Sequence, residues 1–343
     1  MGSKRNPRPI RLHFFFRNPS SGGAYSVERV FDAIIGEIPS DRFTVRKIVC
    51  PFISKGLIRR ALLMVWAACR QGDINHITGD INFIGLLMRR DKTVQTILDA
   101  RSLQRLKGLP RAIYQLFWLT LPLRRAGRTT VISEATRREI APYAGDGGAR
   151  IRVLPCCLTV KIEALQAPPS GGPPRILQVG TTSNKNLEGV IAALEGFACV
   201  LVIVGPLSPT QLDLLRKTGL NFENHIALDD AALLEQYRRV NLVVFASTYE
   251  GFGLPILEAQ ALGRPVVTSN REPMRSVAGR GAILIDPDDH SDIRNAVESV
   301  LGDAKLRQKL CEDGRENALQ YLPANIAAQY CALYEEMTGD KRR

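Results

Sequence analysis

The chain has 343 residues, of which 45% are hydrophobic, and its 46 Lys and Arg against 34 Asp and Glu give a formal net charge of +12. This length suggests two domains, and the composition is that of a globular protein. The seven cysteines show neither the Cys-x-x-Cys spacing of a zinc site nor a secreted disulfide framework, so we expect buried thiols in a reducing compartment.

Charge is shared unevenly along the chain. Residues 1–170 hold 28 Lys and Arg and 12 Asp and Glu, a net charge of +16, and the remainder has a net charge of −4. A basic half joined to a mildly acidic half predicts different partners for the two. The N-terminal segment is too short and too polar for a signal sequence, so we expect the protein in the cytoplasm or peripheral on the inner face of the cell membrane.

The first half opens with a predicted strand, Ile10–Phe16, which leads through a glycine-rich loop containing Gly22 and Gly23 into a predicted helix, Val27–Ile35. A glycine-rich loop that enters a helix suits an anionic ligand. Further strands of this half are predicted at 44–49, 94–98, 129–132 and 151–154.

A polar loop is predicted at 76–80, where His76 and Asp80 lie. A lone histidine here is either a catalytic side chain or a structural one, and the sequence leaves both open. Residues 107–128 then mix basic side chains with Phe117 and Trp118. Such a helix either lies on an anionic membrane or packs its apolar face into the core, and the +16 charge favours the membrane.

Residues 166–174, rich in Pro and Gly, are predicted to form a linker between the two domains. Beyond it, short apolar runs alternate with helical stretches, which predicts a parallel sheet covered by helices. The predicted strands are 175–179, 200–204, 226–228, 242–245, 265–268 and 282–285. Near the C-terminus, an apolar stripe from Ile326 to Met337 predicts a helix that packs on a domain, followed by a basic tail at 341–343.

Three turns of this half can contact a ligand. The strand at 175–179 runs into Gly180, Thr181 and, a little further on, Lys185 and Asn186, an arrangement that resembles a phosphate-binding turn without the Walker spacing. Gly205 ends another strand, where a plain turn is an equal alternative. The strand end near Leu228 either holds the edge of a nucleobase or, with Tyr237, belongs to the core.

The most informative segment is 247–269. Glu250 follows a buried strand, and Glu258 lies about two turns into the next predicted helix. Between them, Gly251 and Gly253 let the backbone approach a ligand, and the helix start offers N–H groups to a phosphate. Carboxylates beside a phosphate site are suited to hydroxyl groups, so the pattern favours a nucleotide-sugar over a plain turn.

Taken together, these motifs resemble glycosyltransferase family 4. The resemblance is carried by 180–186, the approach from Tyr237 to Phe245, the segment from Glu250 to Glu258 and the Gly-x-Pro-Val-Val of 263–267. It implies the α/β GT-B fold, two Rossmann-like domains that face each other across a cleft, with a C-terminal helix returning to the first. The implied domains are an acceptor domain (1–165), the linker (166–174), a donor domain (175–322) and the returning helix with its tail (323–343).

The resemblance also implies roles for individual residues. Glu258 would hold the ribose, and Glu250 would lie beside the sugar as a catalytic group together with Lys185. The donor diphosphate would be contacted by Lys185, the backbone of Gly253 and Leu254, and Gly22 and Gly23. The remaining implied donor residues are Gly180, Thr181, Asn186, Gly205, Leu228, Gly251 and Phe252, and the candidates on the acceptor side are His76, Asp80 and Asp99.

The chain departs from the family pattern at Leu98 and Asn82, where relatives often have histidines. The implied activity is retaining transfer of a hexose, with no metal or other cofactor, from a nucleotide-sugar to a glycan or lipid-linked acceptor in surface polysaccharide or lipopolysaccharide synthesis. GDP-mannose is favoured over a UDP-sugar. The alternatives are a nucleotide-sugar-binding subunit without turnover and a nucleic-acid-binding protein, and the second lacks any recognisable module.

Overall fold

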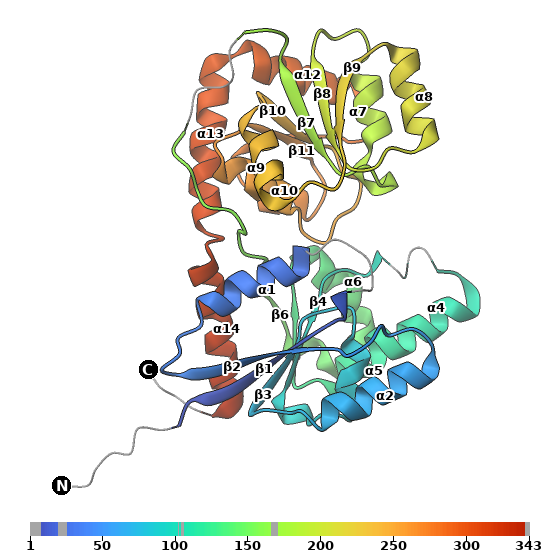
Figure 1. The fold of residues 1–343 in the computed structure, drawn as a ribbon, viewed down its shortest axis with the longest axis vertical. Coiled ribbons are helices and arrows are strands. Elements are labelled where there is room, and N and C mark those ends of the chain that lie inside the picture. The colour runs from blue at the N-terminus through green and yellow to red at the C-terminus, as the bar shows by residue number, and fades with distance from the viewer. Residues whose placement is uncertain (1–7, 20–25, 102, 104–105, 166–170, 340–343) are drawn as a thin grey trace, which may run out of the picture. The chain divides into compact units, whose positions relative to one another are not determined.

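The computed structural model describes residues 8–19, 26–101, 103, 106–165 and 171–339. The chain forms two compact units, of which the first takes Met1–Thr159 and Pro323–Arg343 and the second takes Val160–Leu322. Figure 1 shows both units, with most of their helices and strands labelled. Gly22, Gly23, most of the predicted linker and the tail at 341–343 lie outside the described residues.

Within the described residues, the first unit has one six-stranded sheet in the order β2-β1-β3-β4-β5-β6, and all its paired strands are parallel. Its strands are β1 Ile10–Phe16, β2 Phe43–Val49, β3 Ile74–Ile77, β4 Thr93–Ile97, β5 Arg128–Val131 and β6 Ile151–Val153. Its α-helices are α1 Ser26–Gly36, α2 Leu57–Ala68, α4 Gly108–Tyr114, α5 Leu121–Arg125, α6 Glu134–Ala144 and α14 Pro323–Thr338. Shorter turns of helix are η2 Asn82–Leu87, η3 Arg90–Lys92, η5 Gly145–Arg150 and the π-helix η4 Gln115–Thr120.

The described part of the second unit also has one parallel six-stranded sheet, in the order β12-β11-β10-β7-β8-β9. Its strands are β7 Arg175–Val179, β8 Val200–Val204, β9 Asn221–His225, β10 Leu242–Phe245, β11 Val266–Ser269 and β12 Ala282–Ile285. Its helices are η6 Ser183–Lys185, α7 Leu187–Ala193, α8 Pro209–Thr218, α9 Asp230–Arg238, α10 Leu254–Ala261, α11 Met274–Ala278, α12 His290–Gly302 and α13 Ala304–Leu319.

Two predictions of secondary structure were wrong. The strand predicted at 226–228 is β9 at Asn221–His225, whose polar sequence at the edge of the sheet carries no apolar signal. The predicted polar loop at 76–80 begins only after β3, a four-residue strand buried along its whole length although Asn75 and His76 lie in it. Short central strands with polar residues escape a search for apolar runs.

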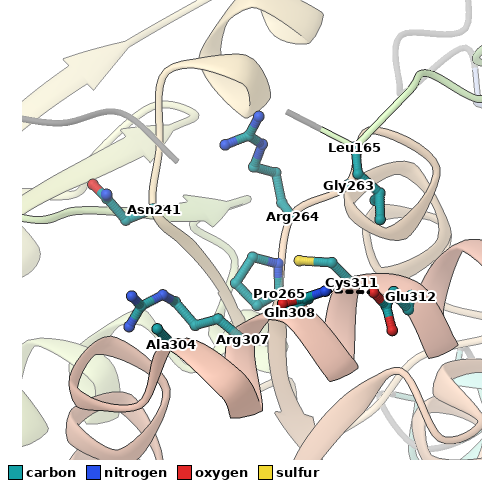
Figure 2. Close-up of a pocket in the computed structure, with 10 residues that line it drawn as sticks. All are labelled: Leu165, Asn241, Gly263, Arg264, Pro265, Ala304, Arg307, Gln308, Cys311 and Glu312. Carbon is teal, nitrogen blue, oxygen red and sulfur yellow. Dashed lines mark hydrogen bonds between the residues drawn. The ribbon is translucent and has the colours of Figure 1, made fainter. Parts of the chain in front are cut away.

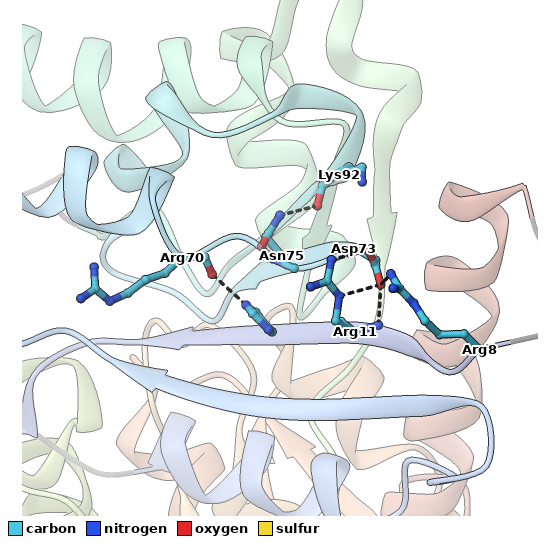
Figure 3. Close-up of polar contacts among 8 residues, drawn as sticks. Arg8, Arg11, Arg70, Asp73, Asn75 and Lys92 are labelled. Atoms are coloured by element: carbon cyan, nitrogen blue, oxygen red, sulfur yellow. Dashed lines mark hydrogen bonds and ion pairs between the residues drawn. The ribbon is translucent and has the colours of Figure 1, made fainter.

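The amino ends of β1 and β3 are joined by charge (Figure 3). Asp73, just before β3, accepts hydrogen bonds from the Arg11 backbone N–H at 3.0 Å and from the Arg11 guanidinium at 3.0 and 3.2 Å. The hydrogen bonds from Arg11 hold the pKa of Asp73 well below its usual range. Further along β1, the His13 ring donates to the carbonyl of Arg70, just after α2, at 2.8 Å. The amino ends of these strands are therefore held by polar contacts.

Helix α14 packs into the first unit as its apolar stripe predicts. Ile326, Tyr330, Leu333 and Tyr334 are all buried. The two tyrosines meet an aromatic cluster from β1 and α1, where Tyr334 lies 6.2 Å from Phe14 and Tyr330 lies 6.0 Å from Phe31, ring to ring. Ion pairs of Glu336 with Arg128 and Arg152, and of Glu335 with Arg42, close the rim of this contact.

Candidate functional site

The sheet order of the second unit points to one candidate place for a ligand. From its first strand the chain builds outward through β8 and β9, then crosses back to the other side of β7 to form β10. In open parallel sheets, the loops that leave the carboxyl ends of two such neighbouring strands diverge and form the ligand crevice. Here these loops are 180–186 after β7 and 246–253 after β10, the two segments predicted from the sequence.

The two loops are joined by a lysine and a glutamate. Lys185 Nζ lies 2.7 Å from Glu250 Oε1, and both side chains are largely buried, at 19% and 14% exposed. The ammonium group also lies 4.6 Å from the centroid of the Phe245 ring, at the end of β10. A cation and a carboxylate are thereby held together at the switch point of the sheet.

Asn184, which the sequence analysis did not single out, fixes the spacing of the same loops. Its amide donates to the Tyr249 carbonyl at 2.9 Å and to Glu250 Oε1 at 3.2 Å, and its carbonyl accepts from the Thr248 N–H at 2.8 Å. Glu250 is therefore oriented by two donors from the opposite loop, Lys185 and Asn184. A small polar residue directly before a candidate lysine gives too weak a sequence signal to be identified.

Two glycines leave room for this arrangement. Gly180 has a φ of 92°, and a Cβ there would lie 3.0 Å from the Lys185 side chain. Gly205 has a φ of 136°, and a Cβ there would lie 3.0 Å from Thr181 Oγ1, which donates to the Pro206 carbonyl at 2.6 Å. The turns after β7 and β8 therefore lie against each other.

Helix α10 begins at the carboxyl end of β10. Its N-cap, Gly253, has a φ of 119° and makes no side-chain cap, and Leu254 is only half-buried. Glu258 is buried within this helix, and its Oε2 accepts a hydrogen bond from the buried Tyr237 hydroxyl at 2.8 Å. Tyr237 is fully buried, as its core alternative predicted, and its hydroxyl orients the carboxylate predicted to hold the ribose.

Other predicted donor residues lie in different surroundings. The Phe252 side chain is buried against Tyr321, with ring centroids 5.9 Å apart, so only its backbone is left to face a ligand. Asn186 adopts a left-handed conformation and donates to the Pro287 carbonyl at 2.6 Å. Leu228 is half-buried in the loop after β9, next to Ala227, whose positive φ of 54° marks a strained turn.

The first unit has its own switch point, between β1 and β3. Arg17, at the end of β1, lies 2.8 Å from Asp80 after β3 and 2.7 Å from Glu28 at the start of α1. Loss of hydration raises the pKa of Asp80 although Arg17 lowers it, and Asp80 has a positive φ of 56°. Arg17 and Asp80 line a cavity of about 190 Å³ that also contacts Asn18, Phe52, Ser54 and Leu63.

The other residues predicted on the acceptor side are placed differently. His76 is fully buried in β3, with Nδ1 2.6 Å from the Tyr334 hydroxyl and Nε2 2.7 Å from Thr96 Oγ1. It therefore has the structural role that the sequence left open, and it is closed to an acceptor. Asp99 accepts from the Arg101 N–H at 3.0 Å in the loop after β4.

The two departures from the family pattern lie near this edge. Leu98 packs on Gly79, where an added Cβ would lie 2.9 Å from its Cδ1. Asn82 is buried at the start of η2, and its Oδ1 has no hydrogen-bond partner. A buried amide oxygen without a donor is costly, which makes Asn82 a candidate contact for a ligand hydroxyl.

The cavity shown in Figure 2 lies at the opposite edge of the second sheet. It measures about 330 Å³ and adjoins the amino ends of β10 and β11. Its lining is Leu165, Asn241, Gly263, Arg264, Pro265, Ala304, Arg307, Gln308, Cys311 and Glu312. It contains no predicted site residue and is separate from the Lys185–Glu250 pair.

Within the described ranges, no three or more His, Cys, Asp or Glu side chains are grouped as they would be around a metal ion. None of the helices in the same ranges is long and apolar enough to cross a membrane.

Solved structures show the fold. Anabaena HepE in complex with UDP and glucose matches 95% of this chain and all of its own, with a TM-score of 0.76 and 16% identity. WaaG, a glycosyltransferase involved in lipopolysaccharide biosynthesis, matches 96% of this chain and all of its own, with a TM-score of 0.68 and 16% identity. The two parallel six-stranded sheets with the C-terminal helix are those of the GT-B fold, as predicted.

Curated relatives match part of the chain. The O-antigen chain mannosyltransferase B of Escherichia coli is 35% identical over 120 residues, 35% of this chain and 31% of that protein. The glycogen synthase of Mycobacterium tuberculosis is 30% identical over 218 residues, 58% of this chain and 50% of that protein. The matched regions thus span about a third and a half of these relatives.

The family model described as Glycosyl transferases group 1 matches residues 161–317, almost the whole second unit, which contains the Lys185–Glu250 pair and the buried Glu258. The segment 161–317 therefore belongs to the glycosyl transferases group 1 family, as its motifs predict.

Proposed function

We propose that this protein is a retaining hexosyltransferase, which moves a hexose from a nucleoside diphosphate sugar to a glycan or lipid-linked acceptor in surface polysaccharide or lipopolysaccharide synthesis. The observation that carries the proposal is the Lys185–Glu250 pair at the switch point of the second sheet. Family membership and the O-antigen mannosyltransferase among its relatives support it.

The pair has two tasks in this proposal. The Lys185 ammonium neutralises the negative charge that develops on the departing diphosphate, a contact of about 1.5–3 kcal/mol. Glu250, held by Lys185 and Asn184, accepts hydrogen bonds from the sugar hydroxyls. Glu258, oriented by Tyr237, binds the ribose. No metal is needed, because lysine and backbone N–H groups stabilise the phosphates.

GDP-mannose is the proposed donor. The matched regions of this chain are 29–35% identical to those of several mannosyltransferases, including the O-antigen enzyme and an MMP alpha-(1->4)-mannosyltransferase of Mycolicibacterium hassiacum. HepE, whose structure contains UDP and glucose, resembles this chain in fold at 16% identity, which leaves a UDP-sugar as the donor to test against it.

The test is a donor screen. The protein is incubated with GDP-mannose, UDP-glucose, UDP-galactose and ADP-glucose, and hydrolysis or transfer is followed by NMR of the anomeric proton. One donor should be turned over with retention of its anomeric configuration. Donor binding without any turnover would favour the alternative, a nucleotide-sugar-binding subunit. This alternative is motivated by Leu98 and Asn82, which stand where relatives often have histidines.

Variants assign the roles. Lys185→Met should weaken nucleoside diphosphate affinity by about tenfold or more, the equivalent of about 1.4 kcal/mol. Glu250→Gln should lower kcat far more than it lowers this affinity, since the contact is made to the sugar. Lys217→Met, at an exposed lysine near the end of α8, is the matched control. Equal affinities for the Lys185 and Lys217 variants would remove Lys185 from the site.

A further inference from the structure

Helix α2 presents apolar side chains to the surface. Leu57 and Ile58 are 80% and 79% exposed, and Leu62 and Val65 are more than half exposed. At 100° per residue, these positions gather on one side of the helix, while Leu63 is buried in the core on the other. Four large apolar side chains on a solvent-facing helix side are unusual for a soluble surface.

A second apolar stripe runs along α4 and η4. Leu109, Ile113, Leu116 and Phe117 are exposed at the i, i+4, i+7 and i+8 positions of one helical face. The opposite side of the same segment supplies buried core residues, Leu119 among them. The sequence left two alternatives for the segment 107–128, an apolar face in the core or an apolar face on a membrane. The segment has an apolar face in the core and a second apolar face that is exposed.

The two stripes belong to neighbouring elements. The Arg60 guanidinium of α2 lies 4.5 Å from the centroid of the Trp118 ring in η4, and Trp118 stacks on Tyr114 at 5.5 Å. We call the eight exposed apolar residues and their basic surroundings the α2–η4 surface, defined by Leu57, Ile58, Leu62, Val65, Leu109, Ile113, Leu116 and Phe117.

The two segments that carry these stripes contain charges of one sign. The sequence contains no Asp or Glu between residues 42 and 72 or between 100 and 133, whereas each of these segments contains seven Lys and Arg. Exposed basic residues lie directly beside the stripes, including Arg59, Lys107 and Arg111. Apolar side chains surrounded by cations match an anionic bilayer, where each Lys or Arg near the surface contributes about 1 kcal/mol.

The α2–η4 surface is connected to the switch point of the first sheet. Trp118 Nε1–H donates to the Asp80 carbonyl at 3.2 Å, and Asp80 holds a strained positive φ. Asp80 lines the cavity of about 190 Å³ together with Leu63 from the buried side of α2. The elements that bear the apolar stripes thus also shape this cavity.

We propose that the α2–η4 surface docks on an anionic lipid bilayer, and that Trp118 is a positioning residue that holds Asp80 in place in the docked protein. The docking stands on the surface alone. Its consequence, that a lipid-linked acceptor reaches the cavity from the membrane, rests on the proposed function.

Docking is tested by flotation of the full chain with vesicles of phosphatidylcholine, with and without phosphatidylglycerol. The protein should float with the anionic vesicles at low salt and be released at high salt, because exposed charges are screened. Leu57→Gln/Ile58→Gln/Leu109→Gln/Phe117→Gln should weaken vesicle binding by at least about tenfold. The matched control is Phe222→Gln/Ile226→Gln/Leu319→Gln, which removes exposed apolar residues of the second unit.

Three results would overturn the docking. They are no flotation with anionic vesicles at low salt, equal binding to neutral vesicles, and an equal loss in the control variant. A dimer that dissociates when Leu57 and Ile58 are exchanged would assign the surface to a second copy of the chain. Since flotation needs no turnover, its outcome is independent of the donor screen.

The role of Trp118 is tested by fluorescence and by rate. The chain has only two tryptophans, Trp66 in α2 and Trp118 in η4. With Trp66→Phe, the emission of Trp118 alone should shift to shorter wavelength on anionic vesicles. Trp118→Phe keeps the ring but loses the N–H donor, so it should still float.

Donor turnover completes this test. In the wild type, vesicles should raise turnover by about fivefold or more, within the usual range of coupling between sites. In Trp118→Phe, this stimulation should be lost while the unstimulated rate remains. A variant that is stimulated like the wild type would show that Trp118 does not position Asp80.

Discussion

Gly180 is the residue on which the Lys185–Glu250 pair depends most directly. Its φ of 92° disfavours any side chain, and a Cβ would press on Lys185 at 3.0 Å. Gly180→Ala should therefore lower the free energy of unfolding by about 1–3 kcal/mol through backbone strain. It should also displace Lys185 and weaken nucleoside diphosphate binding by about tenfold, as measured by calorimetry.

Gly219 provides the control for this prediction. It has a φ of 63° at the C-cap of α8, and an added Cβ would meet nothing within 4 Å. Gly219→Ala should thus cost a similar free energy of unfolding and leave nucleotide affinity unchanged. If both variants lost affinity equally, the loss would come from general destabilisation rather than from the position of Lys185.

Asn82 allows a second prediction at this scale. Its buried Oδ1 lacks a donor, and such a group costs about 1–3 kcal/mol. Asn82→Leu, which keeps the branched shape and the number of heavy atoms without the polar atoms, should raise the free energy of unfolding by about 1 kcal/mol and lower donor turnover. Urea unfolding and the donor screen measure the two effects. If the variant were more stable but kept full turnover, the proposed contact of Asn82 with a ligand hydroxyl would be wrong.

Among the elements, β3 and α14 are coupled through His76. Burial holds the pKa of His76 at about 3, below the ordinary value of 6.5. Below pH 6.5 the unfolded chain binds a proton that the folded chain does not, so stability falls as the pH falls from about 6.5 toward 3. The slope is at most about 1.4 kcal/mol per pH unit.

This dependence should disappear in His76→Gln. The variant is less stable at every pH, since it loses the geometry of the contacts with Tyr334 and Thr96, but its thermal midpoint should change less between pH 6.5 and 4.5. His290→Gln, at the exposed start of α12, controls for the loss of one imidazole. A wild-type slope in the His76 variant would assign the pH dependence to other groups.

The elements also show what the sequence can predict. The bounds of β7, β8, β10 and β12 were predicted without error, because each of these strands is largely apolar in sequence. β10 is buried along its whole length, whereas β12, at the edge of the sheet, is mostly half-buried. The edge strand β9 and the short β3 were misplaced, since the first is polar and the second contains Asn75 and His76. Burial of polar residues is decided by partners far along the chain, such as Tyr334 for His76.

The candidate site divides in the same way. Glycines with positive φ and charged residues at strand ends have local signatures, so Gly180, Lys185 and Glu250 were predicted from their own neighbourhoods. The direction in which a side chain points has no such local signature in the sequence. The inward turn of Phe252 against Tyr321, the hydrogen bond from Tyr237 to Glu258 and the bridging role of Asn184 depend on three-dimensional packing.

At the scale of the molecule, the two units differ in how the chain builds them. The second is one continuous segment, Val160–Leu322, whereas the first needs Pro323–Arg343 in addition to Met1–Thr159. The segment 160–322 contains both Lys185 and Glu258. It should therefore fold alone and bind the nucleoside diphosphate, which circular dichroism and calorimetry can measure.

The segment 1–159 should not fold alone. Without α14 it would expose the rings of Phe14, Phe31 and His76, which Tyr330 and Tyr334 cover in the whole chain. A peptide of residues 323–339 added in trans should restore cooperative unfolding, because it returns the aromatic contacts and the ion pairs of Glu335 and Glu336. The same peptide with Tyr330→Ala/Tyr334→Ala should fail, whereas Gln329→Ala, on the exposed side of α14, should succeed. Cooperative unfolding of 1–159 without any peptide would mean that α14 only covers a unit that is already complete.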